Sequence, residues 1–401
     1  MSRPPYRPDI VLVPAWVAEH PETVERLNGL LAEAGFGRPL SPPAAPAPPA
    51  VELVELPVQG DPVALTRALA RASRRLAGRS DADVPECLPD YECMAATVED
   101  DARSEGSLYP YFRASGCKSG HGTVAWLPAP DYVMLPKPLR RPASQFPAGR
   151  PVVALLDTGV REHDWLVETD GEPYWEEAQG WTPLRTIPAV AGQESRGEEA
   201  DQPDFGSHWG HGTFLAGLIR LEAPDARILS LRVMSDAGRV SDVNAAHALN
   251  WLADRVSEGH RVDVVLTAFG RPRVGEDEEM EPVREALKRL ADRGVPVVAS
   301  AGNGGTDSPV YPAAFAADPT LTVVSVGACA SPTARAPYSN HGVWVRQWHE
   351  GTNVVSIMPL STAPVTVLGA YAYWSGTSFA AARYAGRLAQ GLVPASVRLP
   401  D

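Results

Sequence analysis

Two patterns of hydrophobic and polar residues meet near residue 150. Beyond that point, apolar runs of strand length alternate with helical stretches such as residues 243–256 and 281–294. The apolar runs are PVVALLDTG (151–159), ARILSLRVM (226–234), VDVVLTAFG (262–270), GVPVVASAGN (294–303) and LTVVSVGA (321–328). Because these runs lack the alternation of a half-exposed strand, they predict a mostly parallel sheet covered by helices on both faces. In such α/β folds the functional side chains lie at the carboxyl ends of the strands.

The first 80 residues follow another pattern, in which a strand is followed by a helix twice. A strand is expected at Asp9–Val13, and a helix over 21–37, where apolar residues recur three and four positions apart. The same order repeats in 51–58 and 61–78. We therefore expect a small α+β module before the α/β domain.

Proline-rich stretches at 37–50 and 135–151 have the composition of extended linkers. They divide the chain into four expected segments. These are an N-terminal α+β module (1–134), a proline-rich linker (135–149), an α/β domain (150–393) and a C-terminal tail (394–401).

Composition and charge narrow the possible partners. The 401 residues carry a net charge of −13, which disfavours binding to a phosphate backbone, so no nucleic-acid partner is expected. No stretch has the roughly 18 uncharged apolar residues of a membrane span, and the N-terminus lacks the pattern of a secretory signal. Four cysteines are too few for a disulfide scaffold of this length. We expect a soluble, cytoplasmic protein without membrane partners.

Four polar residues follow the predicted buried strands or begin the predicted helices. Asp157 ends the first apolar run, His211 begins the apolar stretch HGTFLAGLI, Asn303 follows VVASAG, and Ser378 lies in WSGTSFAAARYAG. A serine attacks an acyl group only when a histidine takes its proton, a carboxylate orients the histidine, and donors stabilise the oxyanion. The order Asp157, His211, Ser378 is one of several that such a triad adopts on unrelated folds.

These motifs, DTG, HGT, SAGN and GTSxA in this order, resemble those of the subtilisin-like serine proteases, or subtilases, over roughly residues 150–393. The resemblance implies a three-layer fold and a serine endopeptidase acting on polypeptides through an acyl-enzyme. It implies catalytic roles for Asp157, His211 and Ser378, and an oxyanion donor at Asn303. It assigns substrate binding to Ala237 and Gly238 in an edge strand, to Ala268, Phe269 and Gly270 in a pocket wall, and to Ala301 and Gly302.

The sequence departs from the family pattern around the serine. Ala382 and Arg383 stand where the family usually has proline and histidine, and Leu266 and Ala268 replace a frequent asparagine and serine. The alternative function is therefore a catalytically weak pseudoprotease or scaffold that binds a peptide or partner protein in the same groove. No cofactor is required for the chemistry. Calcium binding is possible in the family, but the acidic run at 275–282 does not specify it.

Other polar residues leave alternatives open. A second HGT begins at His121, before the aspartate, and we expect it to be a coincidence. Cys87, Cys93, Cys117 and His121 leave a weak zinc alternative, because a C-x2-C pair is missing. His208 is expected to be an exposed loop residue and not a metal ligand. The N-terminal module is either a removable propeptide, with 131–138 as a segment that occupies the cleft, or a permanent module that docks a regulatory protein.

Overall fold

The chain forms two compact units, Met1–Cys93 with Ser241–Val243 and Met94–Val240 with Asn244–Asp401. The computed structural model describes residues 6–14, 17, 20–41, 53–62, 64–66, 68–69, 88–95, 125–126, 137–167, 171–183, 208–236, 238–273, 280–359 and 371–392.

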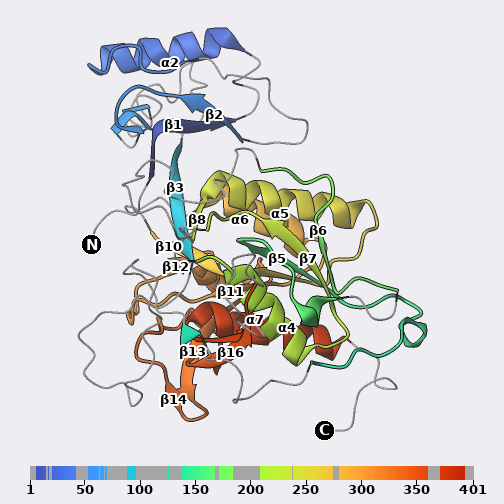
Figure 1. Ribbon diagram of the computed structural model, residues 1–401. Coiled ribbons are helices and arrows are strands. Elements are labelled where there is room, and N and C mark those ends of the chain that lie inside the picture. Colours follow the sequence, from blue (N-terminus) through green and yellow to red (C-terminus); the bar gives the residue numbers. More distant parts are fainter. Residues whose placement is uncertain are drawn as a thin grey trace, which may run out of the picture. The chain divides into compact units, whose positions relative to one another are not determined.

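The larger unit contains an eight-stranded sheet (Figure 1). In order across the sheet the strands are β14 (Ala334–Arg335), β13 (Val323–Ser331), β11 (Val297–Ser300), β9 (Val264–Thr267), β5 (Val152–Asp157), β7 (Arg227–Arg232) and β6 (Trp175–Glu177), and β15 (Gln347–Glu350) also pairs with β13. All of these pairs are parallel except that of β13 with β14. The five predicted apolar runs form the five adjacent strands from β13 to β7, so the predicted parallel sheet is confirmed.

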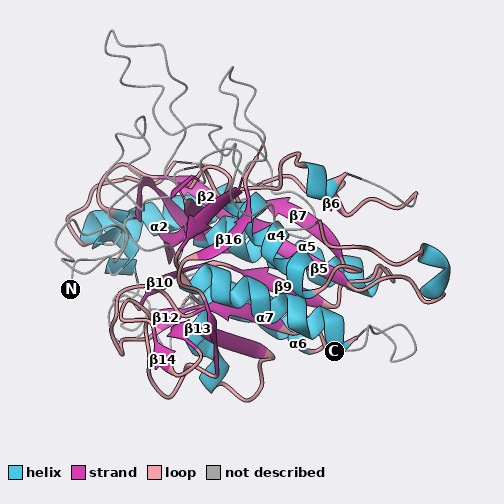
Figure 2. Ribbon diagram, turned by 60° about the horizontal axis from the view of Figure 1, so that its bottom comes forward, coloured by secondary structure: helices cyan, strands magenta, loops and turns pink. Residues whose placement is uncertain are grey.

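Helices cover both faces of this sheet (Figures 1 and 2). Helices α5 (Asp242–Ser257) and α6 (Glu281–Ala291) lie on one face, and α4 (His211–Glu222) and α7 (Thr377–Gly391) lie on the other. Every residue of β5, β9 and β11 is buried, which explains why their sequences do not alternate. Among the described residues, no helix is both long enough and apolar enough to cross a bilayer.

The strand order changes direction within the sheet. Strand β7 lies on one side of β5, whereas β9, β11 and β13 follow one another on the other side. The order therefore reverses beside β5. Ligands of open α/β sheets bind outside the carboxyl ends of the strands at such a reversal, which here means the ends of β5 and β9.

Shorter strands complete the larger unit. Strands β10 (Phe269–Pro272) and β12 (Val310–Tyr311) form an antiparallel pair. Strands β16 (Val354–Ile357), β17 (Tyr371–Trp374) and β4 (Ala125–Trp126) form a small antiparallel sheet. Strand β8 (Arg239–Ser241) lies directly before α5. Helix α4 packs against β5 of the large sheet, against β16 of the small sheet and against α7.

The smaller unit combines antiparallel strands with a helix. Strand β1 (Tyr6–Pro14) lies between β2 (Leu53–Pro57) and β3 (Leu88–Ala95), and α2 (Pro21–Glu33) follows β1 in the chain. Its core comprises apolar side chains from β1, α2, β2 and the helical positions 62–69, including the predicted helix positions Val24, Leu27 and Leu31. The predicted strand–helix pattern of the first 80 residues is thus confirmed where the structure describes it.

Residues 137–150, in the proline-rich segment, are bound to the larger unit. The Arg141 guanidinium donates to Asp225 Oδ2 from Nε at 2.7 Å and from Nη2 at 2.5 Å. The Arg220 guanidinium donates to the carbonyl oxygen of Pro138 at 2.8 Å, and burial lowers the pKa of Arg220 to about 10. Charge-assisted hydrogen bonds of this kind are stronger than neutral ones, so this part of the segment is fixed to the α/β core.

Candidate active site

Asp157 and His211 form a buried pair at the carboxyl end of β5. Asp157 is the last residue of β5, and His211 is the first residue of α4. The imidazole Nδ1 lies 2.8 Å from Asp157 Oδ1 and 3.0 Å from Oδ2. Both side chains are 0% exposed. A carboxylate accepts hydrogen bonds, so this contact assigns the proton of the neutral imidazole to Nδ1 and leaves the lone pair on Nε2.

The backbone around this pair is held by the strand-to-loop turn after Asp157. The Thr158 N–H donates to Asp157 Oδ1 at 2.8 Å, and the Gly212 N–H donates to Thr158 Oγ1 at 3.0 Å. A Cβ on Gly212 would lie 2.5 Å from the carbonyl oxygen of Gly159, so the beginning of α4 approaches the turn more closely than any side chain allows. This close approach accounts for the glycine of the HGT motif.

Aromatic rings surround the His211 side chain. The Trp374 ring lies edge-on at 5.4 Å between centroids, and the Phe379 ring lies at 5.6 Å. Nε2 of His211 is buried and has no hydrogen-bond partner in the described part of the chain. A buried nitrogen without a partner is costly for stability, and such atoms point to a functional role.

Ser378 lies at the beginning of α7, directly before Phe379, whose ring packs against His211. It is the second residue of the helix and is 0% exposed. Its hydroxyl donates to the carbonyl oxygen of Ala268 at 3.1 Å, and His211 Nε2 does not accept a hydrogen bond from it. The structure therefore joins the aspartate to the histidine, whereas the serine hydroxyl is bound to the residue after β9. Hydrogen bonds between catalytic groups often form fully only when substrate is bound.

Asn303 lies in the loop after β11 and is fixed by the residue before the serine. The Thr377 N–H donates to Asn303 Oδ1 at 2.9 Å, and the Gly302 N–H donates to Thr377 Oγ1 at 3.0 Å. Because Oδ1 accepts this bond, the amide orientation is set, and Nδ2 is buried with no partner among the described residues. The structure thus places a hydrogen-bond donor that has no partner among the described residues next to the beginning of α7, which carries Ser378.

Two residues that the sequence analysis did not single out support these loops. Asn340 Nδ2 donates to the Ala301 carbonyl oxygen at 2.9 Å, and the Asn340 N–H donates to the Gly302 carbonyl oxygen at 2.9 Å. The Tyr338 hydroxyl donates to the Gly351 carbonyl oxygen at 2.8 Å, and this oxygen also accepts the N–H of Gly376. No local pattern marks either residue, because both act on loops far away in sequence.

The predicted substrate-binding residues lie in different surroundings. Ala268 contacts the serine hydroxyl through its carbonyl oxygen, and Phe269 and Ala301 are fully buried. Gly302 adopts a φ of 93° beside Asn303. Gly238 is packed against the His208 ring, because a Cβ there would lie 2.5 Å from His208 Nδ1. Ala237 lies outside the described residues.

One expectation about histidine is wrong. His208 is 6% exposed and its ring lies 5.7 Å from that of His211, so it is a buried neighbour of the pair and not an exposed loop residue. The described residues contain no group of three side chains that could hold a metal ion. Several predicted alternatives fall on residues that the structure does not describe, namely Cys87, Cys117, His121, residues 131–136 and residues 275–279 of the acidic run. The zinc, calcium and cleft-segment alternatives therefore stay predictions.

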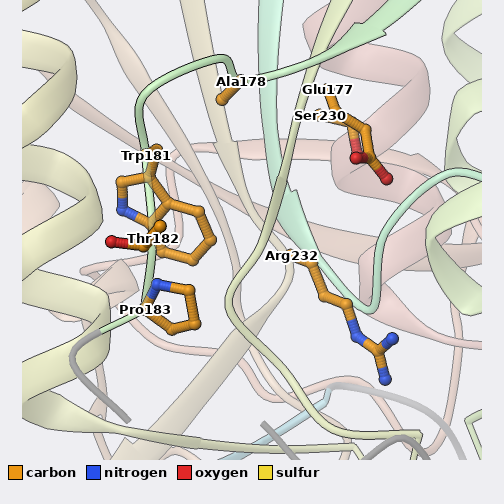
Figure 3. A pocket seen from close by; sticks show the side chains of 7 residues that line it. All are labelled: Glu177, Ala178, Trp181, Thr182, Pro183, Ser230 and Arg232. Carbon is orange, nitrogen blue, oxygen red and sulfur yellow. The ribbon is translucent and has the colours of Figure 1, made fainter. Parts of the chain in front are cut away.

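A separate cavity of about 480 Å³ lies at the β6–β7 edge of the sheet. Trp181, Thr182 and Pro183 lie on one side of it, and Glu177, Ser230 and Arg232 on the other (Figure 3). None of the predicted site residues lines this cavity.

The Arg232 guanidinium, which lines the cavity, lies 3.6 Å from the carboxylate of Asp236. Burial raises the pKa of Asp236, and the positive charges of Arg161 and Arg232 oppose this shift.

Comparisons with known proteins agree with the geometry. Residues 149–393 match the model of the Subtilase family. The chain is 29% identical over 246 residues to Subtilisin BL of Lederbergia lenta, covering 59% of this chain and 74% of that protein. It is 25% identical over 217 residues to the Major intracellular serine protease of Bacillus subtilis (strain 168), covering 50% and 60%.

Among solved structures, a cold adapted subtilisin-like serine proteinase is similar with a TM-score of 0.44 and 22% identity, over 61% of this chain and 76% of that one. The matched family segment contains the Asp157–His211 pair, Asn303 and Ser378, and it covers more than half of the chain. This protein therefore belongs to the subtilase family of serine proteases, and it is a subtilisin-like serine peptidase.

Proposed function

We propose that this subtilase is an endopeptidase in which Ser378 is the nucleophile, His211 the general base and acid, and Asp157 the residue that orients the imidazole. One observation carries the proposal. The fully buried Asp157–His211 pair leaves Nε2 without a partner among the described residues, and the imidazole packs against Phe379, the residue after Ser378. A neutral imidazole with its proton fixed on Nδ1 is the form that accepts a proton from serine.

In the proposed first step, the Ser378 hydroxyl leaves the Ala268 carbonyl oxygen, donates to His211 Nε2 and attacks the carbonyl carbon of a peptide bond. The proton passes to Nε2, and the imidazolium is stabilised by the Asp157 carboxylate 2.8 Å from Nδ1. The same proton is then given to the leaving amine. Water hydrolyses the resulting acyl-enzyme through the same groups in reverse roles.

We propose that Asn303 Nδ2 and the Ser378 N–H stabilise the oxyanion that forms during each attack. Asn303 is suited to this role because Thr377 holds its Oδ1 at 2.9 Å and so directs Nδ2 to the other side. A donor that is already oriented and buried needs no reorganisation when charge develops, which is the main source of its catalytic effect. Asn340 is proposed as a positioning residue for this loop. The chemistry uses only groups of the chain itself.

The substrate of a protease is a polypeptide, and we propose that this one binds as an extended strand beside the segment around Gly238. A cytoplasmic location is proposed because relatives from Paenibacillus polymyxa and Bacillus subtilis are named intracellular serine proteases. The N-terminal module is proposed to regulate the peptidase, either as a propeptide that is cut away or as a docking site for a regulatory protein.

A fluorophosphonate probe tests the proposal, because it labels only an activated serine. The full-length protein is expected to be labelled, and Ser378→Ala is expected to abolish both labelling and peptide hydrolysis. Ser257→Ala removes a hydroxyl that donates to the Ala253 carbonyl oxygen in α5 and is the matched control. Folded wild-type protein without Ser378-dependent labelling would support the peptide-binding alternative instead. Intact mass of wild type and Ser378→Ala then shows whether self-cleavage removes the N-terminal module.

A further inference from the structure

We propose that Asn303 is a site of spontaneous deamidation that inactivates the peptidase. In this reaction the backbone nitrogen of Gly304 attacks the side-chain amide of Asn303 and releases ammonia. The modification itself uses no catalytic residue, whereas the loss of activity rests on the proposed function of Asn303 as an oxyanion donor. The modification therefore limits the working life of the enzyme.

The chain contains two Asn-Gly sequences, Asn28–Gly29 and Asn303–Gly304. Such a sequence favours deamidation, because glycine has no Cβ that shields its nitrogen and it lets the backbone turn toward the preceding side chain. The two sequences lie in different surroundings. The structure therefore distinguishes a protected asparagine from a reactive one.

Asn28 is the protected asparagine. It lies within helix α2 and is 3% exposed. Its Nδ2 donates to the Leu40 carbonyl oxygen at 2.9 Å, and its Oδ1 accepts the Leu40 N–H at 2.9 Å. In a helix the backbone nitrogen of the next residue points toward the preceding turn and away from the side-chain amide. Attack at Asn28 therefore requires α2 to open and both bonds to Leu40 to break.

Asn303 lies in the loop after β11, outside any helix or strand. Asn303 is half-buried and Gly304 is exposed, so water and hydroxide reach the attacking nitrogen. Nδ2 is the atom that leaves, and it has no hydrogen-bond partner among the described residues. In contrast to Asn28, the leaving amide nitrogen is not held in place by the described part of the chain.

The Thr377 N–H activates the amide of Asn303 toward attack. It donates to Asn303 Oδ1 at 2.9 Å. When Cγ becomes tetrahedral, negative charge develops on Oδ1, and a donor that is already in place stabilises this charge. The same contact directs Nδ2 away from Thr377. The hydrogen bond that orients Asn303 for its proposed role therefore also favours the loss of its amide.

The proposed reaction has two steps. In the first, the Gly304 nitrogen forms a bond to Asn303 Cγ, the Cγ–Nδ2 bond breaks, and the proton of the Gly304 nitrogen leaves with Nδ2 as part of ammonia. In the second, water opens the resulting succinimide at either of its carbonyl carbons and yields an aspartyl or an isoaspartyl residue. Both products carry a carboxylate in place of the amide. The site then lacks the donor and holds a negative charge where the oxyanion develops.

The modification is measured on full-length Ser378→Ala, in which the proposed catalysis and hence autolysis are absent. The folded protein is incubated at alkaline pH, because the attacking nitrogen has to lose its proton, and peptide mapping by mass spectrometry then detects the replacement of NH2 by OH. Asn303 is expected to react at least about tenfold faster than Asn28, because reaction at Asn28 requires local opening of α2. In the urea-unfolded chain the two sites are expected to react at similar rates. Equal rates in the folded protein would overturn the inference.

A variant of Gly304 tests which nitrogen attacks. Gly304→Ala adds a Cβ that shields this nitrogen, and the Cβ would lie 3.0 Å from Thr306 Cγ2. The substitution is therefore combined with Thr306→Ser, which removes this methyl group and keeps the hydroxyl that accepts the Ser308 N–H at 2.9 Å. The double variant is expected to lower the rate at Asn303 severalfold, whereas Thr306→Ser alone is expected to react like the unchanged loop. A folded double variant that reacts as fast as Thr306→Ser would contradict the mechanism.

The loss of activity is followed in the protein that retains Ser378. Its kcat per intact chain is expected to fall in proportion to the modified fraction of Asn303, and Asn303→Asp is expected to reproduce the low kcat of the modified enzyme. Modified Asn303 with unchanged kcat would retain the modification site and reject the proposed oxyanion role. Unmodified Asn303 in an active enzyme would reject the inference and leave the proposed function intact.

Discussion

The two ends of the α4–α7 helix pair are built differently. At the beginning of the helices, His211 and the residues next to Ser378 form a buried site in which His211 Nε2 and Asn303 Nδ2 have no partner among the described residues. Toward their other end, Glu222 of α4 accepts hydrogen bonds from Arg383 at 2.6 Å and from Arg387 at 3.0 Å. The charges that join the helices are paired, whereas these two nitrogen atoms of the site have no partner among the described residues.

This difference separates stability from function within one pair of helices. Between the two ends, Phe214 and Phe379 pack with 4.8 Å between their centroids, and Gly386 approaches α4 so closely that a Cβ would lie 2.8 Å from Glu222 Cβ. Packing and ion pairs hold the helices together, so the helix beginnings can carry polar atoms whose partners are expected to come from a substrate. Arg383, which departs from the family pattern, belongs to the stabilising end.

The largest expected effect tests the unpaired donor. Asn303→Ala is expected to lower kcat by about 10²–10³-fold with little change in KM, the loss already known for an oxyanion asparagine of a subtilisin. The reason is that the donor acts on charge that develops only in the transition state. Steady-state kinetics with one peptide substrate provide the measurement. A raised KM with unchanged kcat would show that Asn303 only binds the substrate.

The next effect tests the paired end. Glu222→Ala leaves Arg383 and Arg387 without this partner, and it is expected to lower the free energy of unfolding by about 1–3 kcal/mol. Urea denaturation provides the measurement. Glu285→Ala changes an exposed carboxylate 4.0 Å from Arg284 and is expected to cost less than about 0.5 kcal/mol. Equal losses in the two variants would mean that the α4–α7 ion pairs do not stabilise the helix pair.

The smallest effect concerns Tyr338, whose hydroxyl donates to the Gly351 carbonyl oxygen that also accepts the N–H of Gly376, directly before α7. Burial raises the pKa of Tyr338 to about 12 from its usual 10, against the opposing hydrogen bond with Thr352. The unfolded chain loses this proton at lower pH than the folded protein does. The stabilisation is therefore complete below pH 10 and is lost as pH rises from 10 to 12.

At pH 11 the loss from Tyr338 is expected to be about 1 kcal/mol, and thermal or urea unfolding of wild type against Tyr338→Phe isolates it from other groups that titrate there. Between pH 9 and pH 11 the wild type is expected to lose more stability than the variant. Parallel losses in the two proteins would show that the folded and unfolded chains titrate Tyr338 alike.

Local patterns were sufficient to predict the strands and to single out the candidate site residues. The apolar runs ending at Asp157 and before Asn303 became β5 and β11 because residues buried on both faces of a sheet leave a continuous signal in the sequence. The stretch after His211 became a helix buried along ten successive residues for the same reason. The exposure of His208 was wrongly predicted, because a single histidine carries no sign of what packs around it.

The sequence by itself determined the parallel sheet and indicated the four candidate site residues, because short motifs and the period of burial are properties of neighbouring positions. Only the tertiary structure decided that Asp157 meets His211 and that the Ser378 hydroxyl is bound to Ala268. These contacts join residues tens of positions apart. They depend on packed atoms fitting together to within a few tenths of an ångström, and no local sequence pattern encodes such a fit.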